Sequence, residues 1–479
     1  MTEEVLVFYA SVDGGNRGRV ENVRCKLFLP KKSTGLLRFK FYPSADQKSV
    51  IENMWEFSVE GDIKDDAGKV WTSMRAGKAH WSSGEHESTQ WEPDLSEWVM
   101  VGEPRDLMIT HFLRSDPSIP TDKAEGSFWL TPSSLLSHAR MDEPLENGGF
   151  SVRTIYQPTF TLPDGTPLVF KERYHFYTYE GKERVTFSEP VLEFELEGDA
   201  TDIAKQDDLH SLVEDFLVLI SFAARQRCMC VGWDVREELN YKSFYRRDIA
   251  IPSVEEGRGW PNELIDLADI EEFMKVAQTG FSRIEHKVSV RRALNHTIPS
   301  AGRTLESRFV SLYAALESLL SFFSEKEQLV ILPSEQFREL ESDLRKWLKQ
   351  HPLLQQSGDK RSLIYEKIRE LNRVSFSAAF KRFCGHYSVD LSDLWPVTGK
   401  AEDWPLSEIR NKLVHGATFD YRQDGVLYCA MENLKWSVER MLLAILGWPV
   451  SRSRVSPDYL TRVMTMHNNW KTKRELLTG

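Results

Sequence analysis

Short apolar runs separated by turn residues fill roughly the first 200 positions of the chain. Three of these runs, at 5–9, 23–29 and 36–42, are rich in β-branched and aromatic residues. The second and third alternate in part between apolar and polar positions, as half-buried strands do. Glycine and proline separate the runs, and Pro163-Asp164-Gly165 predicts a hairpin turn. Regular short strands between turns predict a sandwich, a barrel or a similar antiparallel architecture.

The pattern changes near residue 200, where an acidic junction is followed by apolar residues at helical spacing over 209–220. A polar, proline-bearing stretch at 251–262 predicts a loop. Three later segments, at 305–323, 337–348 and 427–446, each carry one apolar stripe, and Gly447 and Pro449 predict where the last one ends. Such stripes bury against one another, so we expect a helical bundle.

The fold class that follows is α+β and multidomain, with a β-rich N-terminal region followed by an all-α bundle. We expect three parts. Residues 1–200 form the β-rich domain, 201–299 a helical connecting region, and 300–479 a helical domain with a C-terminal extension.

The chain has 479 residues, enough for two or three domains, and a formal net charge of −11. This acidic balance argues against non-specific coating of nucleic acid, because phosphate binding needs clustered Lys and Arg; any RNA site must be a local patch. The five cysteines do not have the spacing of zinc ligands, so we expect no metal, no cofactor and a reducing, cytoplasmic location. The N-terminus lacks a secretory signal, and no apolar run approaches the roughly 20 residues of a membrane helix.

A short segment between the second and third of these helices, at 403–416, has the pattern of a capped helix. Pro405 suits the first turn, and Gly416 predicts the end. Three apolar residues fall on one face: Leu406, Ile409 and Leu413.

Arg410, Asn411 and His415 give this segment its chemistry. Asn411 and His415 are four residues apart and share the face opposite the apolar stripe, while Arg410 lies at its edge. These groups suit RNA cleavage without a metal: a 2′-hydroxyl attacks the adjacent phosphate, histidine moves a proton, and a guanidinium stabilises the developing charge. The amide can hold the phosphate or orient the histidine. One histidine cannot easily serve as base and acid in the same step, which favours two copies meeting across a two-fold axis.

The spacing of Arg410 and His415 is weak evidence by itself, because Arg291 and His296 repeat it. That second pair lacks an asparagine after the arginine, a clean apolar stripe and a terminating glycine. From the chemistry alone, a structural role for the 410–415 residues, with the histidine at the helix C-terminus, fits equally well.

Arg410-Asn-Lys-Leu-Val-His415-Gly resembles the Arg-Asn-x-x-x-His signature of HEPN domains, a helical family rich in RNA-cleaving toxins and defence proteins. The segment at 309–320, Phe-Val-Ser-Leu-Tyr-Ala-Ala-Leu-Glu-Ser-Leu-Leu, is similar to the first core helix of that family. The order also agrees: this helix, a variable charged middle, the signature and a long closing helix. Together with the β-rich N-terminal region, the layout resembles ApeA-like bacterial anti-phage (abortive infection) proteins.

This resemblance implies a metal-independent endoribonuclease that acts as a regulated toxin in anti-phage defence. It implies RNA as the substrate, Arg410, Asn411 and His415 as the catalytic residues, and a homodimer formed through the helical region. The N-terminal region would then sense a phage-derived or cellular trigger, or restrain the nuclease.

Three further residues are candidates for substrate binding: Glu317, Arg308 and Lys412. Glu317 lies in the first core helix and can also orient Arg410. A surface role for Glu317 and a solvated charge for Arg308 remain alternatives. Some HEPN domains have no nuclease activity and act as binding or dimerisation modules, and in that alternative Arg410 and His415 would fix a helix pair.

Overall fold

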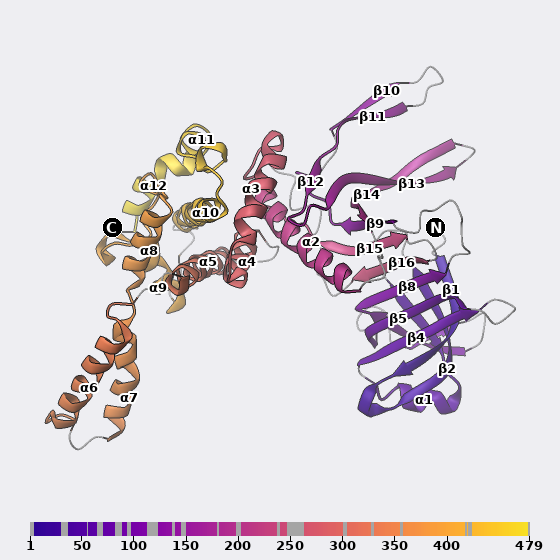
Figure 1. Ribbon diagram of the computed structural model, residues 1–479, viewed down its shortest axis with the longest axis horizontal. Helices are drawn as coiled ribbons and strands as arrows, with labels where there is room; N and C mark the ends of the chain where they lie inside the picture. The colour runs from indigo at the N-terminus through magenta and orange to yellow at the C-terminus, as the bar shows by residue number, and fades with distance from the viewer. Residues whose placement is uncertain are drawn as a thin grey trace. The chain divides into compact units, whose positions relative to one another are not determined.

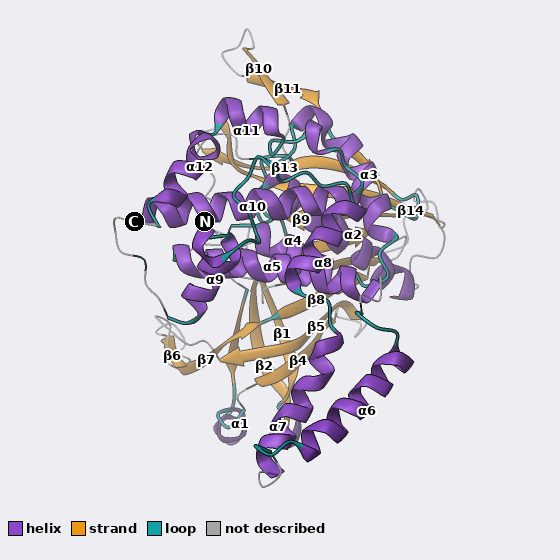
Figure 2. Ribbon diagram, turned by 90° about the vertical axis from the view of Figure 1, so that its left-hand side faces the viewer, coloured by secondary structure: helices purple, strands orange, loops and turns teal. Residues whose placement is uncertain are grey.

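The computed structural model describes residues 4–29, 37–54, 56–64, 70–81, 89–92, 97–112, 123–136, 139–144, 150–179, 182–197, 203–236, 240–246, 263–299, 304–326, 330–354, 358–416, 419 and 424–477. These residues form two compact units. Unit 1 comprises Met1–Glu263 with Leu267–Gln278, and unit 2 comprises Leu264–Asp266 with Thr279–Gly479. Unit 1 is built on antiparallel β-structure and unit 2 on helices (Figures 1 and 2), so the predicted α+β class is confirmed.

Unit 1 contains a sheet of fourteen described strands, all paired antiparallel. The strands are β1 (Glu4–Asp13), β2 (Arg19–Leu29), β3 (Arg38–Tyr42), β4 (Glu56–Lys64), β5 (Val70–Trp81), β6 (Thr89–Glu92), β7 (Glu97–Pro104), β8 (Asp106–Phe112), β9 (Lys123–Leu130), β12 (Thr159–Thr161), β13 (Pro167–Tyr179), β14 (Lys182–Glu197), β15 (Cys230–Arg236) and β16 (Asn240–Arg246). A separate hairpin pairs β10 (Ala139–Pro144) with β11 (Phe150–Tyr156).

Part of this sheet closes on itself. The strand order β5-β4-β1-β2-β3-β7 returns to β5, because β7 pairs with both β3 and β5. Alternate residues of β1, such as Phe8 and Val12, point inward and pack with Phe39, Phe41 and Phe57. The three N-terminal runs predicted as strands are therefore confirmed, and α1 (Ala45–Ile51) lies between β3 and β4 in the chain.

Strand β8 pairs with β5 of the closed part. From β8 the sheet continues in the order β16-β15-β9-β14-β13-β12. The predicted turn at 163–165 joins β12 to β13; Gly165 has a φ of +95° and donates its N–H to the Leu162 carbonyl at 2.9 Å. The helix predicted over 209–220 is present as α2 (Ile203–Ala224) and packs by Phe216 on Phe160, with ring centres 5.0 Å apart.

The predicted helical connecting region at 201–299 is wrong over β15 and β16. After α2 the chain returns to the sheet, where β15 pairs with β9 and β16 with β8. The two units divide at residues 263–279 rather than near residue 200. Both pairings join positions more than 100 residues apart, and local periodicity carries no information about such partners. The loop expected at 251–262 lies outside the described residues.

The helices beyond residue 264 form a bundle, with α3 crossing the boundary between the units. They are α3 (Ile270–Ser282), α4 (Lys287–Thr297), α5 (Leu305–Lys326), α6 (Ser334–Gln350), α7 (Gly358–Ile368), α8 (Phe376–His386), α9 (Leu406–Val414), α10 (Asp424–Leu446), α11 (Pro457–Val463) and α12 (Thr465–Glu475). The three striped helices predicted at 305–323, 337–348 and 427–446 correspond to α5, α6 and α10, so these predictions are confirmed.

Helix α10 lies between α5 on one side and α12 on the other (Figure 2). Nearly every residue of α10 from 426 to 443 is buried, so this helix is central and α11 and α12 follow it. Helices α6 and α7 form a hairpin that extends away from the rest of unit 2 (Figure 1). None of the helices in the described ranges has both the length and the apolar character needed to span a membrane.

Candidate functional site

Helix α9 carries the three predicted catalytic residues and is anchored at its start by backbone bonds. The N–H of Leu406 donates to the Pro396 carbonyl at 2.9 Å, and that of Ser407 donates to the Val397 carbonyl at 3.0 Å. Two of the unpaired amides at the helix start are thereby satisfied without a side-chain cap. Leu406 and Ile409 are fully buried, so the apolar stripe holds the first two turns against the bundle.

The last turn of α9 is more open. The helix ends at Gly416 as predicted: this residue has a φ of +84°, and its N–H donates to the Leu413 carbonyl at 3.1 Å. Leu413 is half-buried, whereas the stripe pattern predicted a buried residue. Leu413 lies one residue before the last helical residue, at the end of the apolar stripe, and the burial of the stripe stops short of it.

Arg410 is held by side chains of α5. Its Nη2 donates to Glu317 Oε1 at 3.0 Å, its Nη1 donates to Asn411 Oδ1 at 3.4 Å, and its guanidinium carbon lies 5.6 Å from the centre of the Tyr313 ring. The Arg410 side chain is 31% exposed and that of Glu317 is 44% exposed. Exposed ion pairs contribute only about 0–1 kcal/mol to stability. These contacts therefore orient the guanidinium more than they stabilise the fold.

The ring of Tyr313 lies against the Arg410 guanidinium. It is buried and stacks on Phe376 of α8, with ring centres 5.6 Å apart and an interplanar angle of 19°. Burial raises the pKa of the Tyr313 phenol, Glu317 raises it further, and Arg410 opposes them. Sequence reasoning assigned no role to Tyr313, although its position one turn before Glu317 was the available signal.

Asn411, Lys412 and His415 lie on the exposed surface of α9. Asn411 and His415 share one side of the helix, as their spacing predicts. Lys412 lies with its Nζ 4.9 Å from the centre of the Trp404 ring. Within the described ranges, no hydrogen bond or ion pair involves the His415 ring. The imidazole and the amide are thus open to an incoming ligand, and the amide lies beside the oriented guanidinium.

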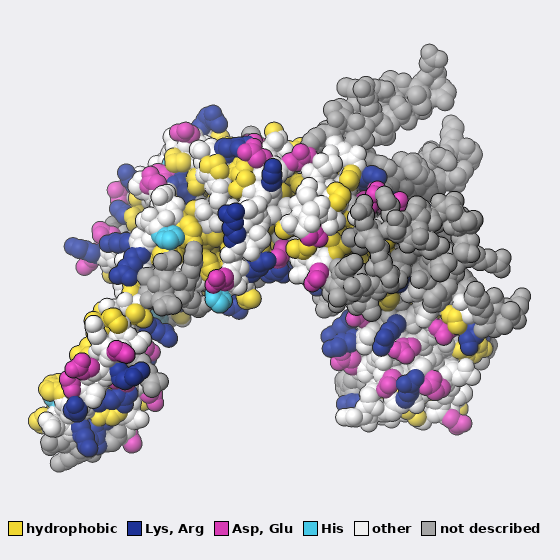
Figure 3. Space-filling view, in the orientation of Figure 1, with side chains coloured by type: hydrophobic (Ala, Val, Ile, Leu, Met, Phe, Trp, Pro, Cys, Tyr) yellow, Lys and Arg dark blue, Asp and Glu magenta, His cyan; other side chains and the backbone are white. Residues whose placement is uncertain are grey.

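Arg308 does not join this cluster. It precedes Glu317 by nine residues on α5, which corresponds to roughly 14 Å along the axis and to the opposite side of the helix. Its charge acts instead on Tyr428 of α10: Glu432 and burial raise the pKa of that phenol, and Arg308 lowers it. On the face shown in Figure 3, Lys and Arg side chains of unit 2 alternate with Asp and Glu.

The competing pair at 291 and 296 has a different environment. His296 Nδ1 lies 2.7 Å from Ser311 Oγ, so this imidazole bridges α4 and α5. It is half-buried between two helices, which is typical of a structural histidine.

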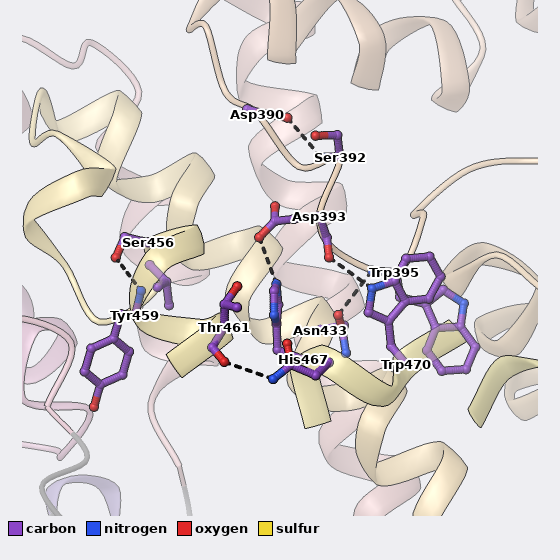
Figure 4. A network of polar contacts seen from close by, with 12 residues as sticks. Asp390, Ser392, Asp393, Trp395, Asn433, Ser456, Tyr459, Thr461, His467 and Trp470 are labelled. Carbon is purple, nitrogen blue, oxygen red and sulfur yellow. Dashed lines mark hydrogen bonds and ion pairs between the residues drawn. The ribbon is translucent and has the colours of Figure 1, made fainter. Parts of the chain in front are cut away.

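A second polar cluster in unit 2 was not predicted; Figure 4 shows the part of it around Asp393, His467 and Trp470. Arg440 of α10 donates to both oxygens of Asp393, at 2.5 and 2.8 Å, and its Nε donates to the Val455 carbonyl at 2.7 Å. His467 Nε2 lies 2.9 Å from Asp393 Oδ2, and Trp470 Nε1 donates to the Asp393 carbonyl at 3.0 Å. The Arg440 side chain is 1% exposed. This buried cluster therefore links α10, α12 and the loop after α8 through hydrogen bonds and ion pairs.

The cysteines are all free. Burial raises the pKa of the Cys228 and Cys230 thiols to about 12 and that of the Cys429 thiol to about 11, so these groups stay protonated at neutral pH. Cys384 is half-buried. Among the described residues, no three His, Cys, Asp or Glu side chains lie where they could hold a metal ion.

Comparison of the chain with models of protein families, with curated proteins and with solved structures found no match in any of the three.

Proposed function

We propose that unit 2 is a metal-independent endoribonuclease with its active centre on α9. The observation that carries this proposal is the arrangement around Arg410: Glu317 and Tyr313 orient its guanidinium, Asn411 lies beside it, and His415, on the same side of the helix as Asn411, is open to solvent. The arrangement combines a fixed cation with an accessible proton carrier, as phosphodiester cleavage requires.

The reaction begins when the 2′-hydroxyl of a nucleotide attacks the adjacent phosphorus. A bond forms between the 2′-oxygen and phosphorus as the bond from phosphorus to the 5′-oxygen breaks. His415 takes the 2′-hydroxyl proton, and a second acid gives a proton to the leaving 5′-oxygen. The products are a 2′,3′-cyclic phosphate and a 5′-hydroxyl. A second copy of the chain can supply that acid as its own His415, which is why we expect an even-numbered oligomer.

Arg410 stabilises the charge that develops on the phosphorus oxygens. A guanidinium has five donor hydrogens in a fixed fork, so contacts to Glu317 and Asn411 leave others for a phosphate. Asn411 can contact the same phosphate or orient His415. In this proposal Glu317 is a positioning residue, and Lys412 contributes only general positive charge.

The test is RNA cleavage by the purified full-length chain in EDTA. We expect RNA to be cut, DNA to stay intact, and the new 3′ ends to resist ligation until acid opens the cyclic phosphate and a phosphatase removes the resulting monoester. His415→Ala and Arg410→Ala should abolish cleavage, and Arg410→Lys should not restore it, because an ammonium cannot reproduce the guanidinium fork. His296→Ala is the matched control and should stay active. Cleavage that is lost in EDTA and restored by magnesium would overturn the metal-free mechanism.

The wider role we propose is that of a cytoplasmic toxin in anti-phage defence, with unit 1 sensing a phage-derived or cellular trigger. Support comes from the resemblance of the signature to HEPN domains and from the division of the chain into a β unit and a helical unit. Growth of cells that express the wild type or His415→Ala tests it. Arrest by both proteins would contradict a role for cleavage in toxicity.

The ion pair between Arg410 and Glu317 favours a second candidate, a non-catalytic binding or dimerisation module. In that case Glu317→Gln and Arg410→Ala would alter association of the chain while RNA stays intact with every variant.

A further inference from the structure

The hairpin of α6 and α7 exposes large apolar side chains. Leu340 is 43% exposed and Trp347 is 58% exposed. They are seven residues apart on α6 and therefore lie on the same face, two turns from each other. The face turned to α7 is different: there the Arg345 guanidinium lies 4.6 Å from the centre of the Tyr365 ring. Among the described helices α6 packs chiefly on α7, and the exposed fractions of Leu340 and Trp347 show that this packing leaves both side chains open.

The charges of α6 are segregated along its length. Its first ten residues, 334–343, carry four carboxylates and one arginine, a net charge of −3. Its last seven residues, 344–350, carry Arg345, Lys346 and Lys349, a net charge of +3. An acidic start and a basic end also stabilise an isolated helix through its dipole. Only the combination of these charges with exposed Leu340 and Trp347 points to a partner.

We propose that α6 pairs in antiparallel orientation with α6 of a second copy of this chain. A two-fold axis perpendicular to the helix places the acidic half of each copy against the basic half of the other, and does so twice. A parallel pair would bring like charges together. Leu340 of one copy then lies against the partner's Trp347, because the two residues are equally far from the centre of the helix pair.

The flanking charges fit the same register. Glu339 and Lys346 each precede an apolar contact residue by one position, so they lie together on one flank of the exposed face. In the antiparallel pair Glu339 lies near the partner's Lys346, and Lys346 near the partner's Glu339. In the single chain Lys346 Nζ bonds Asp343 at 3.0 Å, but both side chains are largely exposed and free to exchange partners. An interface of one helix per copy is small, so we expect a micromolar dissociation constant.

This inference does not rest on RNA cleavage. The surface shares no residue with the cluster on α9, and association is measured without RNA. A chain that associates through α6 but does not cut RNA would overturn the proposed function alone. A chain that cuts RNA and associates normally as Leu340→Glu would overturn the pairing through α6 alone.

The first experiment is sedimentation of the full-length chain across micromolar concentrations. We expect the wild type to dimerise and Leu340→Glu to raise the dissociation constant at least about tenfold, because it places a charge at the centre of an apolar contact. The matched control is Leu363→Glu: Leu363 is also exposed, at 63%, but lies on α7, so the dimer should persist. A wild type that stays monomeric, or a Leu340→Glu variant that dimerises normally, would overturn the proposal.

The second experiment exchanges the flanking charges. Glu339→Lys and Lys346→Glu should each weaken the dimer, because each creates two like-charge contacts across the axis. The double variant should restore it, since it recreates both pairs with the signs reversed. Both substitutions lie on exposed side chains, and a melting curve confirms that each of the three variants is folded. If the double variant stays as weak as the single ones, antiparallel pairing through α6 is wrong.

Discussion

Two arginine–carboxylate pairs of unit 2 have the same chemistry and opposite surroundings. The Arg410 side chain is 31% exposed and meets Glu317 through one nitrogen, whereas Arg440 is 1% exposed and meets both oxygens of Asp393. A buried guanidinium with all its directions used is fixed for structure. An exposed one that keeps free donors can bind a phosphate and release it. Burial, more than residue type, therefore separates the structural pair from the candidate active site.

The neighbouring histidines differ in the same way. His415 is exposed at the end of α9, and His467 is buried against Asp393, with its Nδ1 lacking a hydrogen-bond partner among the described residues. A proton carrier has to reach solvent or substrate. The exposed position of His415 meets this requirement, whereas the buried position of His467 favours a structural role.

The largest effect should come from breaking the buried pair. Arg440→Met leaves Asp393 without its guanidinium partner, and breaking such pairs costs about 3–5 kcal/mol. Arg410→Met should change the free energy of unfolding by less than about 1 kcal/mol, because its pair is exposed. Urea unfolding of the two variants measures both values. Equal losses would remove the distinction between the clusters.

Two apolar residues of α9 should differ by a smaller amount in their contribution to the free energy of unfolding. Ile409 is fully buried, so Ile409→Ala should cost about 2–4 kcal/mol. Leu413 is half-buried, and Leu413→Ala should cost roughly half as much, since fewer contacts are lost. The same urea experiment compares them. A larger loss at Leu413 would mean that the last turn packs more tightly than the structure shows.

The sequence predicted the candidate site better than the buried cluster, and the reason is physical. Arg410, Asn411 and His415 lie within six residues, so helical periodicity alone places them. Asp393, Arg440 and His467 come from three segments spread over 75 residues, and only tertiary packing brings them together. The charged middle of α10 was the available signal, because a helix expected to bury one stripe turned out to be buried all round.

The elements of the fold also differ in how well local sequence patterns predict them. Strands with strong alternation, such as β2, and helices with one apolar stripe, such as α5, were predicted from local patterns. The return of β15 and β16 to the sheet was not, since strand partners depend on distant residues. Exposure of Leu413 depended on where α9 ends within the bundle, which its own stripe does not specify.

Lowering the pH should remove part of the stability that the Arg440–Asp393 pair provides, because it protonates Asp393. Burial alone would raise the pKa of Asp393, but the hydrogen bonds and charge of Arg440, with the bond to His467, outweigh it and lower that pKa. The stabilisation is complete above the value of an unfolded aspartate, about 3.9, and is lost as pH falls through the lowered folded value. The free energy of unfolding should therefore decline below about pH 4, and Asp393→Asn should show a weaker decline. Identical pH profiles would exclude Asp393 as a contributor.

The smallest effect on stability should accompany the largest effect on activity. His415→Ala removes an exposed side chain and should leave the free energy of unfolding within about 0.5 kcal/mol of the wild type. His467→Ala removes a buried partner of Asp393 and should cost about 1–3 kcal/mol. RNA cleavage should show the reverse order under conditions where both variants are folded: His415→Ala is inactive, and His467→Ala retains activity. If His467→Ala is inactive while fully folded, the buried cluster takes part in catalysis. If His415→Ala is as active as the wild type, the exposed histidine is not the proton carrier.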